Sequence, residues 1–267
     1  MLVVSSLDRL SRRGSKKALH PGAFFVCLFW LLASAAVWAQ CPLLPGGFHA
    51  EVAQVYDGDT VRLSSGERVR LIGIDTPEIG RDGRADQPGA RAAGRWLEQR
   101  VQGQQVYLLP GVERRDRYGR LLAHLYWRDE LVAEQMLRQG LGFALALGAN
   151  TRLADCLFSA ENAARGAAAG VWRDAPRAAR ALDKPGFAVV SGRISRITPT
   201  RSGRYLDLDD HLALFLPAAL AERQLRVGQR VEARGWVQDR LQRQSRLRRG
   251  QQRWLLRITT KRHLRLE

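Results

Sequence analysis

Between Ala50 and Trp127 the chain consists of short stretches in which apolar and polar residues alternate, punctuated by turn signals. Alternation with a period of two is typical of strands that bury one face. Asp57-Gly58 separates the first two stretches, and Asp-Gly is a strong hairpin signal. The expected strands are 52–55, 60–63, 68–74, 106–109 and 121–127. This pattern constrains the region to a sheet of short strands.

Three stretches with helical character interrupt or follow these strands. The first, 88–101, has a proline near its start and is rich in Ala, Arg and Leu. The second, 131–139, ends before Gly140, a residue type favoured just after a helix. In the third, 152–165, apolar residues recur at helical spacing. Five strands with a few helices predict an α+β fold: a five-stranded β-barrel of the OB type with helices.

The C-terminal third predicts a second, smaller domain of OB-like β-structure at 187–267. Its expected strands are 189–197, 205–208, 212–216, 230–237 and 254–259. The preceding segment, 177–186, alternates Ala and Arg and contains Pro185, so we expect a linker there. Residues 240–253 carry six arginines and are expected to form an exposed loop. That loop either binds nucleic acid or is a solvated charge run.

The first 39 residues have the pattern of a secretory signal peptide. A basic leader precedes an apolar run, Phe24–Val37, and the small residue Ala39 follows. The run is short for a bilayer span, which disfavours a retained membrane anchor. We therefore expect cleavage after Ala39, export to the periplasm or the medium, and no stable membrane association afterwards. The mature chain then begins with a domain at 40–176, and we expect a monomer.

The cysteines indicate an oxidising compartment. Cys27 leaves with the signal peptide, so the mature chain keeps only Cys41 and Cys156. Two thiols in an oxidising space predict one disulfide, which would tie the N-terminal tail to the third helix. The alternative is a pair of unpaired, buried thiols.

The charge balance indicates a polyanionic partner. The chain has 43 Lys and Arg against 26 Asp and Glu, a formal net charge of +17. Such a surface attracts nucleic acid, although it also fits a need for solubility or an anionic membrane surface. The hydrophobic content of 45% is enough to bury a core, which excludes global disorder.

The first domain contains the residue types that phosphodiester hydrolysis needs. Asp57-Gly58-Asp59-Thr60 and Asp75-Thr76-Pro77-Glu78 place carboxylates at strand ends and turns. Arg70 and Arg120 stay charged and match the geometry of a phosphate. Oxygen-rich ligands suit a hard cation such as Ca²⁺, and the sequence has no His/Cys cluster for zinc. Each segment alone also fits an ordinary turn, a helix start or a charged hairpin tip.

The order and spacing of these segments resemble the staphylococcal-nuclease (thermonuclease-like) family over residues 50–172. The likeness rests on Asp57-Gly58-Asp59-Thr60-Val61, on 69–78, and on Asp116-Arg117-Tyr118-Gly119-Arg120. The segments 137–141 and 170–172 are also similar to that family. The resemblance implies an OB-type barrel that cleaves nucleic acid, here with an added C-terminal domain.

The resemblance also implies a Ca²⁺ site and a base. Asp59 and Asp75 would be side-chain ligands, and the main-chain carbonyl of Thr76 would complete the protein's share. With two carboxylates the affinity should be weak, in the range of ~10⁻⁴ to 10⁻³ M. Glu78 would orient or deprotonate the attacking water.

The remaining implied roles concern the phosphate. Arg70 and Arg120 would hold it, and Arg120 would stabilise the leaving oxygen. Arg117 and Tyr118 would contact a substrate phosphate. Arg70 and Asp75 are five residues apart, so one flat strand would place them on opposite faces. A shared site therefore requires a bend near Gly73.

One segment departs from the family pattern. Members known for base stacking carry tyrosines shortly after the Gln-Gly-Leu segment, whereas 143–148 contains only Phe143 as an aromatic residue. Because stacking is worth ~1–3 kcal/mol per base, substrate affinity or base preference should differ. The sequence as a whole predicts a Ca²⁺-dependent nuclease acting on DNA, RNA or both. The alternative is a catalytically silent OB-fold protein that binds nucleic acid.

Overall fold

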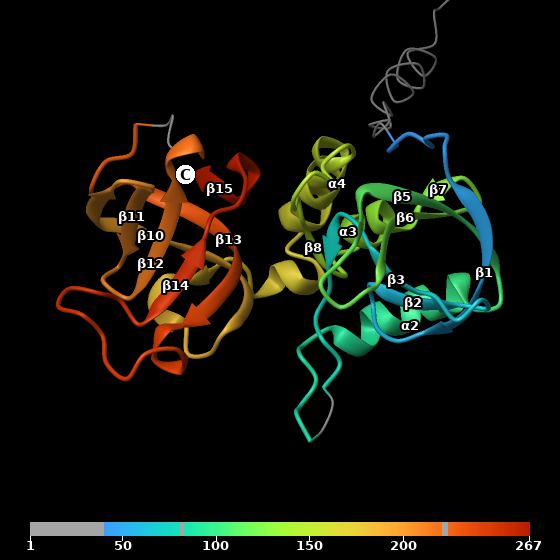
Figure 1. The fold of residues 1–267 in the computed structure, drawn as a ribbon, viewed down its shortest axis with the longest axis horizontal. Coiled ribbons are helices and arrows are strands. Elements are labelled where there is room, and N and C mark those ends of the chain that lie inside the picture. Colours follow the sequence, from blue (N-terminus) through green and yellow to red (C-terminus); the bar gives the residue numbers. More distant parts are fainter. Residues whose placement is uncertain (1–39, 81–82, 221–223) are drawn as a thin grey trace, which may run out of the picture. The chain divides into compact units, whose positions relative to one another are not determined.

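The computed structural model describes residues 40–80, 83–220 and 224–267 (Figure 1). Residues Ala39–Glu267 form one compact unit. The signal peptide expected at 1–39 lies outside the described residues. Within the described part of the chain, no helix is long and apolar enough to cross a membrane.

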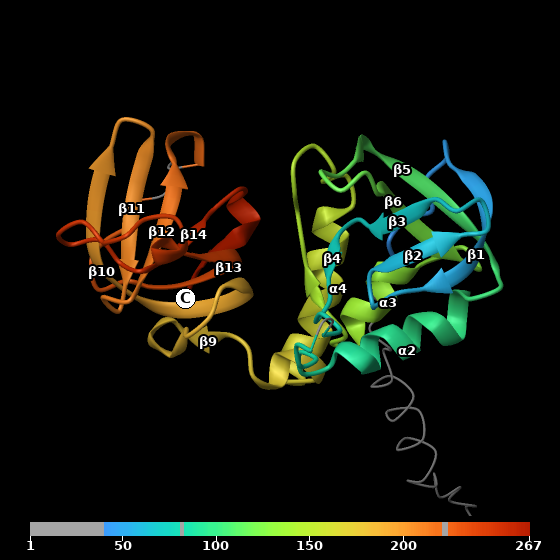
Figure 2. The ribbon, with the colours of Figure 1, turned by 60° about the horizontal axis from the view of Figure 1, so that its bottom comes forward.

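The first sheet closes on itself as a barrel (Figure 2). Its strand order is β3-β2-β1-β5-β6-β7, and β3 also pairs in parallel with β6. The expectation of a five-stranded barrel is therefore confirmed, with the short β7 added at the edge. The strands are β1 (Phe48–Val55), β2 (Thr60–Leu63), β3 (Arg68–Leu71), β5 (Gln105–Arg115), β6 (Leu121–Trp127) and β7 (Glu130–Leu131). A separate pair joins β4 (Ile74–Asp75) to β8 (Phe143–Ala144).

The alternating pattern fills this barrel. Val61 and Leu63 on β2, like Val69 and Leu71 on β3, are buried, while the arginines that alternate with them, at 62, 68 and 70, are more exposed. Each such side chain contributes roughly 1.5–3 kcal/mol when it leaves water. Three helices pack around the barrel: α2 (Ala90–Val101), α3 (Val132–Arg138) and α4 (Ala154–Gly166). They lie close to the three helical stretches that the sequence predicted.

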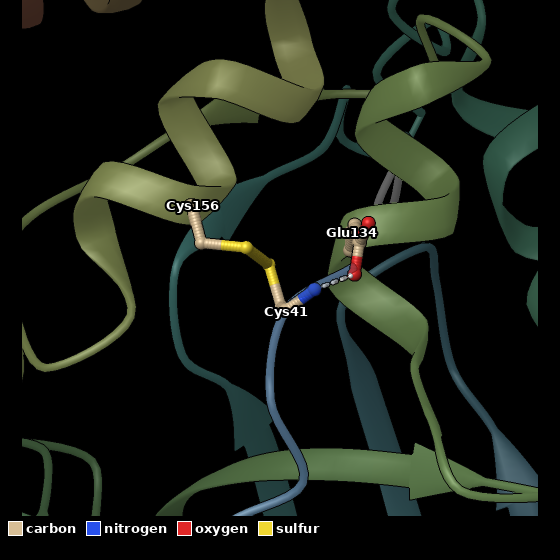
Figure 3. A group of neighbouring side chains, drawn as sticks. All are labelled: Cys41, Glu134 and Cys156. Carbon is tan, nitrogen blue, oxygen red and sulfur yellow. Dashed lines mark hydrogen bonds between the residues drawn. A yellow bond between two sulfur atoms is a disulfide. The ribbon is translucent and has the colours of Figure 1, made fainter. Parts of the chain in front are cut away.

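A disulfide joins Cys41 to Cys156 on α4, across 115 residues of chain (Figure 3). The backbone N–H of Cys41 donates to the buried carboxylate of Glu134 at 2.7 Å, and Arg138 donates to the same carboxylate. Because both sulfur atoms are bonded to each other, these three neighbours form a structural staple rather than a metal site. In the chain-entropy model, a disulfide that closes a loop of this size stabilises the folded state by about 4–5 kcal/mol, because it restricts the unfolded chain.

The second sheet forms another barrel with its own core. Its order is β15-β13-β14-β12-β11-β10-β9, and β13 also pairs with β10, which closes the strands between them. The strands are β9 (Arg177–Ala178), β10 (Gly186–Thr200), β11 (Gly203–Leu208), β12 (Leu212–Pro217), β13 (Arg230–Asp239), β14 (Trp254–Arg257) and β15 (Leu264–Leu266). Short 3₁₀ turns are η1 (Gly170–Arg173), η2 (Ala179–Ala181), η3 (Ala218–Leu220), η4 (Arg240–Gln242) and η5 (Lys261–His263).

The segment expected to be a linker, 177–186, is largely part of this second barrel. Arg177 and Ala178 pair in parallel with β10. Ala179 and Leu182 are buried in the core of the second barrel. The structure therefore differs from the linker expectation, because the Ala and Leu side chains between the arginines find an apolar surface to cover.

The two barrels are joined by buried charges rather than by a free tether. Arg234 on β13 donates to both carboxylate oxygens of Glu161 on α4 at 2.9 Å, and to the carbonyl of Ala144 at 3.0 Å. Arg165 on α4 donates to Glu232 on β13 at 2.8 and 2.5 Å. These contacts fix β13 of the second barrel against α4 of the first.

Candidate active site

A bend after β3 brings Arg70 and Asp75 together. Gly73 adopts a φ of +91°, which favours glycine, and a Cβ there would collide with the side chain of Leu157. The chain then continues as β4. Arg70 Nη2 donates to Asp75 Oδ1 at 2.9 Å, and Nη1 donates to the carbonyl of Ile74 at 2.8 Å. The bend that the odd spacing required is present.

Asp59 joins the same cluster from the residue before β2, the strand that pairs with β3. Its Oδ2 lies 3.2 Å from Arg70 Nη2 and accepts hydrogen bonds of 2.9 Å from the backbone N–H and the hydroxyl of Thr76. Asp59 and Asp75 therefore share one guanidinium nitrogen. Asp57 is next to them, because its Oδ1 accepts from the backbone N–H of Asp59 at 3.1 Å.

The acidic charge of this cluster exceeds what Arg70 can offset. Burial, together with repulsion from Asp59, raises the pKa of Asp57 to about 6. Burial also raises the pKa of Asp75 to about 7, despite the opposing effect of Arg70. The carboxylates act on Arg70 in turn. Burial lowers the pKa of Arg70, but the charges of Asp59 and Asp75 raise it by more, so the net shift is upward. A further positive charge would relieve this repulsion.

Arg120 is held beside the cluster by its own hairpin. Its Nε donates to Asp116 Oδ2 at 2.7 Å, and the backbone N–H groups of Tyr118 and Arg120 donate to Asp116 Oδ1. Arg120 Nη1 also reaches the hydroxyl of Thr60 at 3.2 Å, and that hydroxyl donates to Asp59 Oδ1 at 3.1 Å. Burial raises the pKa of Asp116, but its hydrogen bonds from Arg120 outweigh this and lower the pKa below its usual value. Thr60 thus connects Arg120 to Asp59.

Glu78 lies on an open groove. Its side chain is exposed, and its backbone N–H donates to Gln87 Oε1 at 3.0 Å. The groove has a volume of about 660 Å³ and is also lined by Asp57, Thr60 and Arg120. We call it the Glu78 groove. It places a solvent-accessible carboxylate and a guanidinium on the same wall.

A second groove, of about 670 Å³, begins on the other side of Arg120. We call it the Arg70 groove, because Arg70 lines it as well. Arg117 and Tyr118 lie on its wall, and Arg117 Nη2 donates to the Tyr118 hydroxyl at 2.7 Å. The second barrel also lines this groove, with Trp236, Gln238 and Arg243.

Comparison with known proteins places this chain in a family. Residues 68–174 match the family described as staphylococcal nuclease homologue. The chain is 32% identical to a thermonuclease of Staphylococcus intermedius over 124 residues, 45% of this chain and 74% of the relative. It is 28% identical to a thermonuclease of Staphylococcus hyicus over 125 residues, 46% and 74% of the two chains. The chain belongs to the staphylococcal nuclease family.

A third relative is similar over a smaller share of its own length. An SPbeta prophage-derived endonuclease of Bacillus subtilis is 31% identical over 121 residues, which cover 43% of this chain and 41% of that protein. The family match begins at β3 and ends just after η1, so it contains Arg70, Asp75, Glu78 and Arg120. The second barrel lies outside it.

The structure brings together most of the residues that the sequence singled out for the nuclease site. Asp59, Arg70 and Asp75 are in direct contact, and Arg120 joins them through Thr60. Glu78 and Arg120 share a groove. Arg70 differs from the expectation in one respect: it is already bonded to carboxylates and to backbone carbonyls, rather than pointing free into a groove.

Three residues near the site had no role assigned from the sequence. Asp57 adds negative charge, Thr60 bridges Asp59 and Arg120, and Asp116 orients Arg120. All three stand inside the family-like motifs, so the motifs themselves were the available signal. Phe143, the aromatic residue of the divergent segment, packs edge-on against Trp172 with ring centres 5.2 Å apart. It belongs to the apolar contact between the barrels.

The donor set of the cluster fits a hard cation. Asp59 and Asp75 offer carboxylate oxygens, and the main-chain oxygen of Thr76 is in the next residue. Oxygen-only ligation is what Ca²⁺ selects. Burial is the main cause of the raised pKa values of Asp57 and Asp75, and repulsion from neighbouring carboxylates adds to it, so a cation here would favour their charged forms. The residues present therefore fit a divalent cation of the Ca²⁺ type.

Proposed function

We propose that this protein is an exported, Ca²⁺-dependent nuclease that hydrolyses phosphodiester bonds of DNA, RNA or both. As a member of the staphylococcal nuclease family, the chain is a phosphodiester hydrolase. The observation that carries the finer proposal is the contact of Asp59 and Asp75 with Arg70, beside Arg120, which is linked to Asp59 through Thr60 and lines both grooves.

In the proposed reaction Arg120 binds the scissile phosphate and stabilises the charge that develops on the leaving oxygen. Asp116 keeps the guanidinium in one orientation, so little reorganisation is needed when the substrate arrives. Arg70 offsets part of the negative charge of Asp59 and Asp75 and also lines the Arg70 groove. Such electrostatic positioning is the main route to catalysis of phosphoryl transfer.

Glu78 is the proposed base. Its carboxylate is exposed to water in the groove that Arg120 also lines, so it can orient a water molecule toward the phosphorus and accept its proton. Ca²⁺ bound by Asp59, Asp75 and the Thr76 carbonyl would supply positive charge to the phosphoryl oxygens. Arg117 and Tyr118 are proposed to contact a neighbouring phosphate from the wall of the Arg70 groove.

Export to the periplasm or the medium, as a monomer, is part of the proposal. The Cys41–Cys156 disulfide supports it, because structural disulfides persist in oxidising compartments. Mass spectrometry of the mature protein from the periplasm and the medium tests the compartment and the cleavage after Ala39. A mature N-terminus upstream of Ala39, or thiols that alkylate without reduction, would contradict this part of the proposal.

The second barrel is proposed to add affinity for nucleic acid. On β11 and β12 the rings of Tyr205 and Phe215 lie 5.0 Å apart. Arg240 lies 5.4 Å above the first ring and Arg257 lies 5.1 Å above the second. Aromatic rings combined with guanidinium groups suit stacked bases and phosphates.

The decisive experiment is digestion of labelled single- and double-stranded DNA and RNA by the purified mature protein. We expect cleavage with Ca²⁺, none in EGTA, and recovery when Ca²⁺ is returned. Binding without cleavage under every metal condition would instead favour a catalytically silent binding protein. Full activity in EGTA would remove Ca²⁺ from the proposal but leave the hydrolase in place.

A further inference from the structure

The outer face of β13 runs from the contact between the barrels into the Arg70 groove. Residues 231, 233 and 237 of this strand are buried in the second barrel, so the alternate residues 232, 234, 236 and 238 share the opposite face. Glu232 and Arg234 are held by α4 of the first barrel. Trp236 and Gln238, the next two on that face, line the groove. The ion pairs therefore fix where Trp236 stands.

Trp236 is unusual among the aromatic residues of this contact because it stays open to solvent. Its side chain is 42% exposed. One edge packs on Phe187, with ring centres 5.2 Å apart and planes at 72°. Phe187 in turn packs on Phe143 at 5.7 Å, and Phe143 on Trp172, which is buried. Phe143, Phe187 and Trp172 form part of the apolar contact between the barrels. The indole of Trp236 packs on the last of these rings, Phe187, and lines the groove.

The groove that Trp236 faces has the chemistry of a nucleic-acid path. Arg117 and Arg120 line it from the first barrel and Arg243 lines it from the second, beside the carboxylates of Glu113 and Asp116. Tyr118, 60% exposed, adds another ring on the wall of the first barrel. Guanidinium groups that follow the phosphates, with aromatic rings that stack on bases, are the combination that binds unpaired strands.

We propose that Trp236 is a stacking platform for an unpaired base close to the phosphate that is cleaved, and that Gln238 and Arg243 contact the same nucleotide. The second barrel thus completes the substrate groove of the first. This inference rests on the proposed nuclease function. It assigns a role in substrate specificity to a residue outside the family match. In the first barrel, the aromatic residue of the divergent segment, Phe143, packs on Trp172 instead.

The test is binding of a fluorescein-labelled single-stranded oligonucleotide to the full mature protein in EGTA, where cleavage is not expected. Trp236→Ala should weaken binding roughly 5- to 100-fold, the range measured for loss of one base–aromatic stack. Trp236→Phe should recover most of that loss, because a ring is retained. Phe48→Ala is the matched control: it removes a ring of similar exposure, 43%, from β1, and should change binding less than twofold.

A second measurement separates stacking from a purely structural role. The same variants are tested with a fully paired duplex of the same sequence and by thermal unfolding. We expect Trp236→Ala to lose more affinity for the single strand than for the duplex, with an unfolding temperature close to that of Trp236→Phe. Unchanged affinity for the single strand would overturn the proposal. So would an equal loss for both substrates accompanied by a clear fall in unfolding temperature, which would show that Trp236 only supports the contact between barrels.

The outcome stays distinct from that of the nuclease proposal. If the wild-type protein cleaves nothing with Ca²⁺, the nuclease function fails, while the ratio of single-strand affinities between wild type and Trp236→Ala still decides the stacking role. If the wild type cleaves and Trp236→Ala binds and cleaves single strands equally well, the nuclease stands and this inference fails.

Discussion

Each of the two barrels is a closed sheet of its own, but the two use their carboxylates in opposite ways. In the second barrel acids are matched with arginines: Asp239 accepts from Arg253 at 2.6 Å, and this bond lowers the pKa of Asp239. In the first barrel Asp57, Asp59 and Asp75 gather around Arg70, and the pKa of Asp75 rises to about 7. Matched pairs stabilise a fold, whereas an excess of buried acid creates a place for a cation. The difference between the barrels is one of charge balance rather than of architecture.

The largest effect should come from removing the guanidinium that both grooves share. Arg120→Ala should lower turnover about 10³-fold or more, on the scale of an arginine that stabilises a phosphoryl transition state. Steady-state cleavage of a labelled oligonucleotide measures it. The control is Arg253→Ala in the second barrel, which breaks the pair with Asp239 and should leave turnover within twofold. Equal activity in Arg120→Ala and wild type would remove Arg120 from the site.

Glu78→Gln should lower turnover by roughly 10²- to 10⁴-fold, the range for loss of a general base. Because Glu78 is exposed, the unfolding temperature should stay the same. The matched control is Glu98→Gln, which neutralises another exposed carboxylate on α2 and should leave turnover unchanged. If turnover fell in Glu78→Gln and the cooperative unfolding transition were lost as well, the residue would act on the fold rather than on the reaction.

The contact between the barrels can be broken at two residues that line neither the Glu78 groove nor the Arg70 groove. Glu161 and Arg234 are both buried, so Glu161→Gln should destabilise the protein by about 3–5 kcal/mol, because Arg234 keeps only the more distant carboxylate of Glu232, 3.6 Å away. Urea unfolding measures this change. The double variant Glu161→Leu with Arg234→Met should recover a large part of the loss, because neither charge of this pair then remains and Glu232 keeps its ion pair with Arg165. A loss below about 1 kcal/mol in the single variant would show that the barrels are not energetically coupled through this pair.

A smaller effect should appear with pH at the same contact. Burial, with a contribution from Arg234, lowers the pKa of His263 to about 4, and its Nε2 accepts from the backbone N–H of Ala146 in the first barrel. The folded state therefore favours the neutral ring. The stability linked to His263 is complete above its unfolded pKa of about 6.5 and is lost as pH falls toward 4.

Replacement of that histidine isolates its share. The free energy of unfolding is measured with urea at pH 7 and pH 4.5. Between these two pH values, His263→Gln should lose less of it than wild type does, by on the order of 2 kcal/mol. Replacement of the exposed His49 on β1 serves as the control and should leave the pH dependence unchanged. The same pH dependence in His263→Gln and wild type would assign the acid loss to other groups.

The sequence by itself determined the parts of this protein that depend on neighbours in the chain. A period of two placed the longer strands of both barrels but not the short β7, β9 and β15, because each side chain on a half-buried strand meets the same environment as the one two residues away. Helical spacing placed α4, whereas a starting proline with a composition rich in Ala, Arg and Leu placed α2, and the glycine after its end placed α3. The order of the charged motifs was enough to identify Asp59, Arg70, Asp75 and Arg120 as candidates for one site.

Only the tertiary structure decided how these pieces meet. Thr60 bridges Asp59 to Arg120 across 60 residues, and Arg234 reaches Glu161 across 73. The local sequence around these residues does not reveal either contact. A hydrogen bond or ion pair between distant residues depends on which segments the folded chain brings together, not on local preference. The position of Trp236 is of the same kind. Its alternation with buried neighbours shows that it faces outward, but the first barrel decides what it faces.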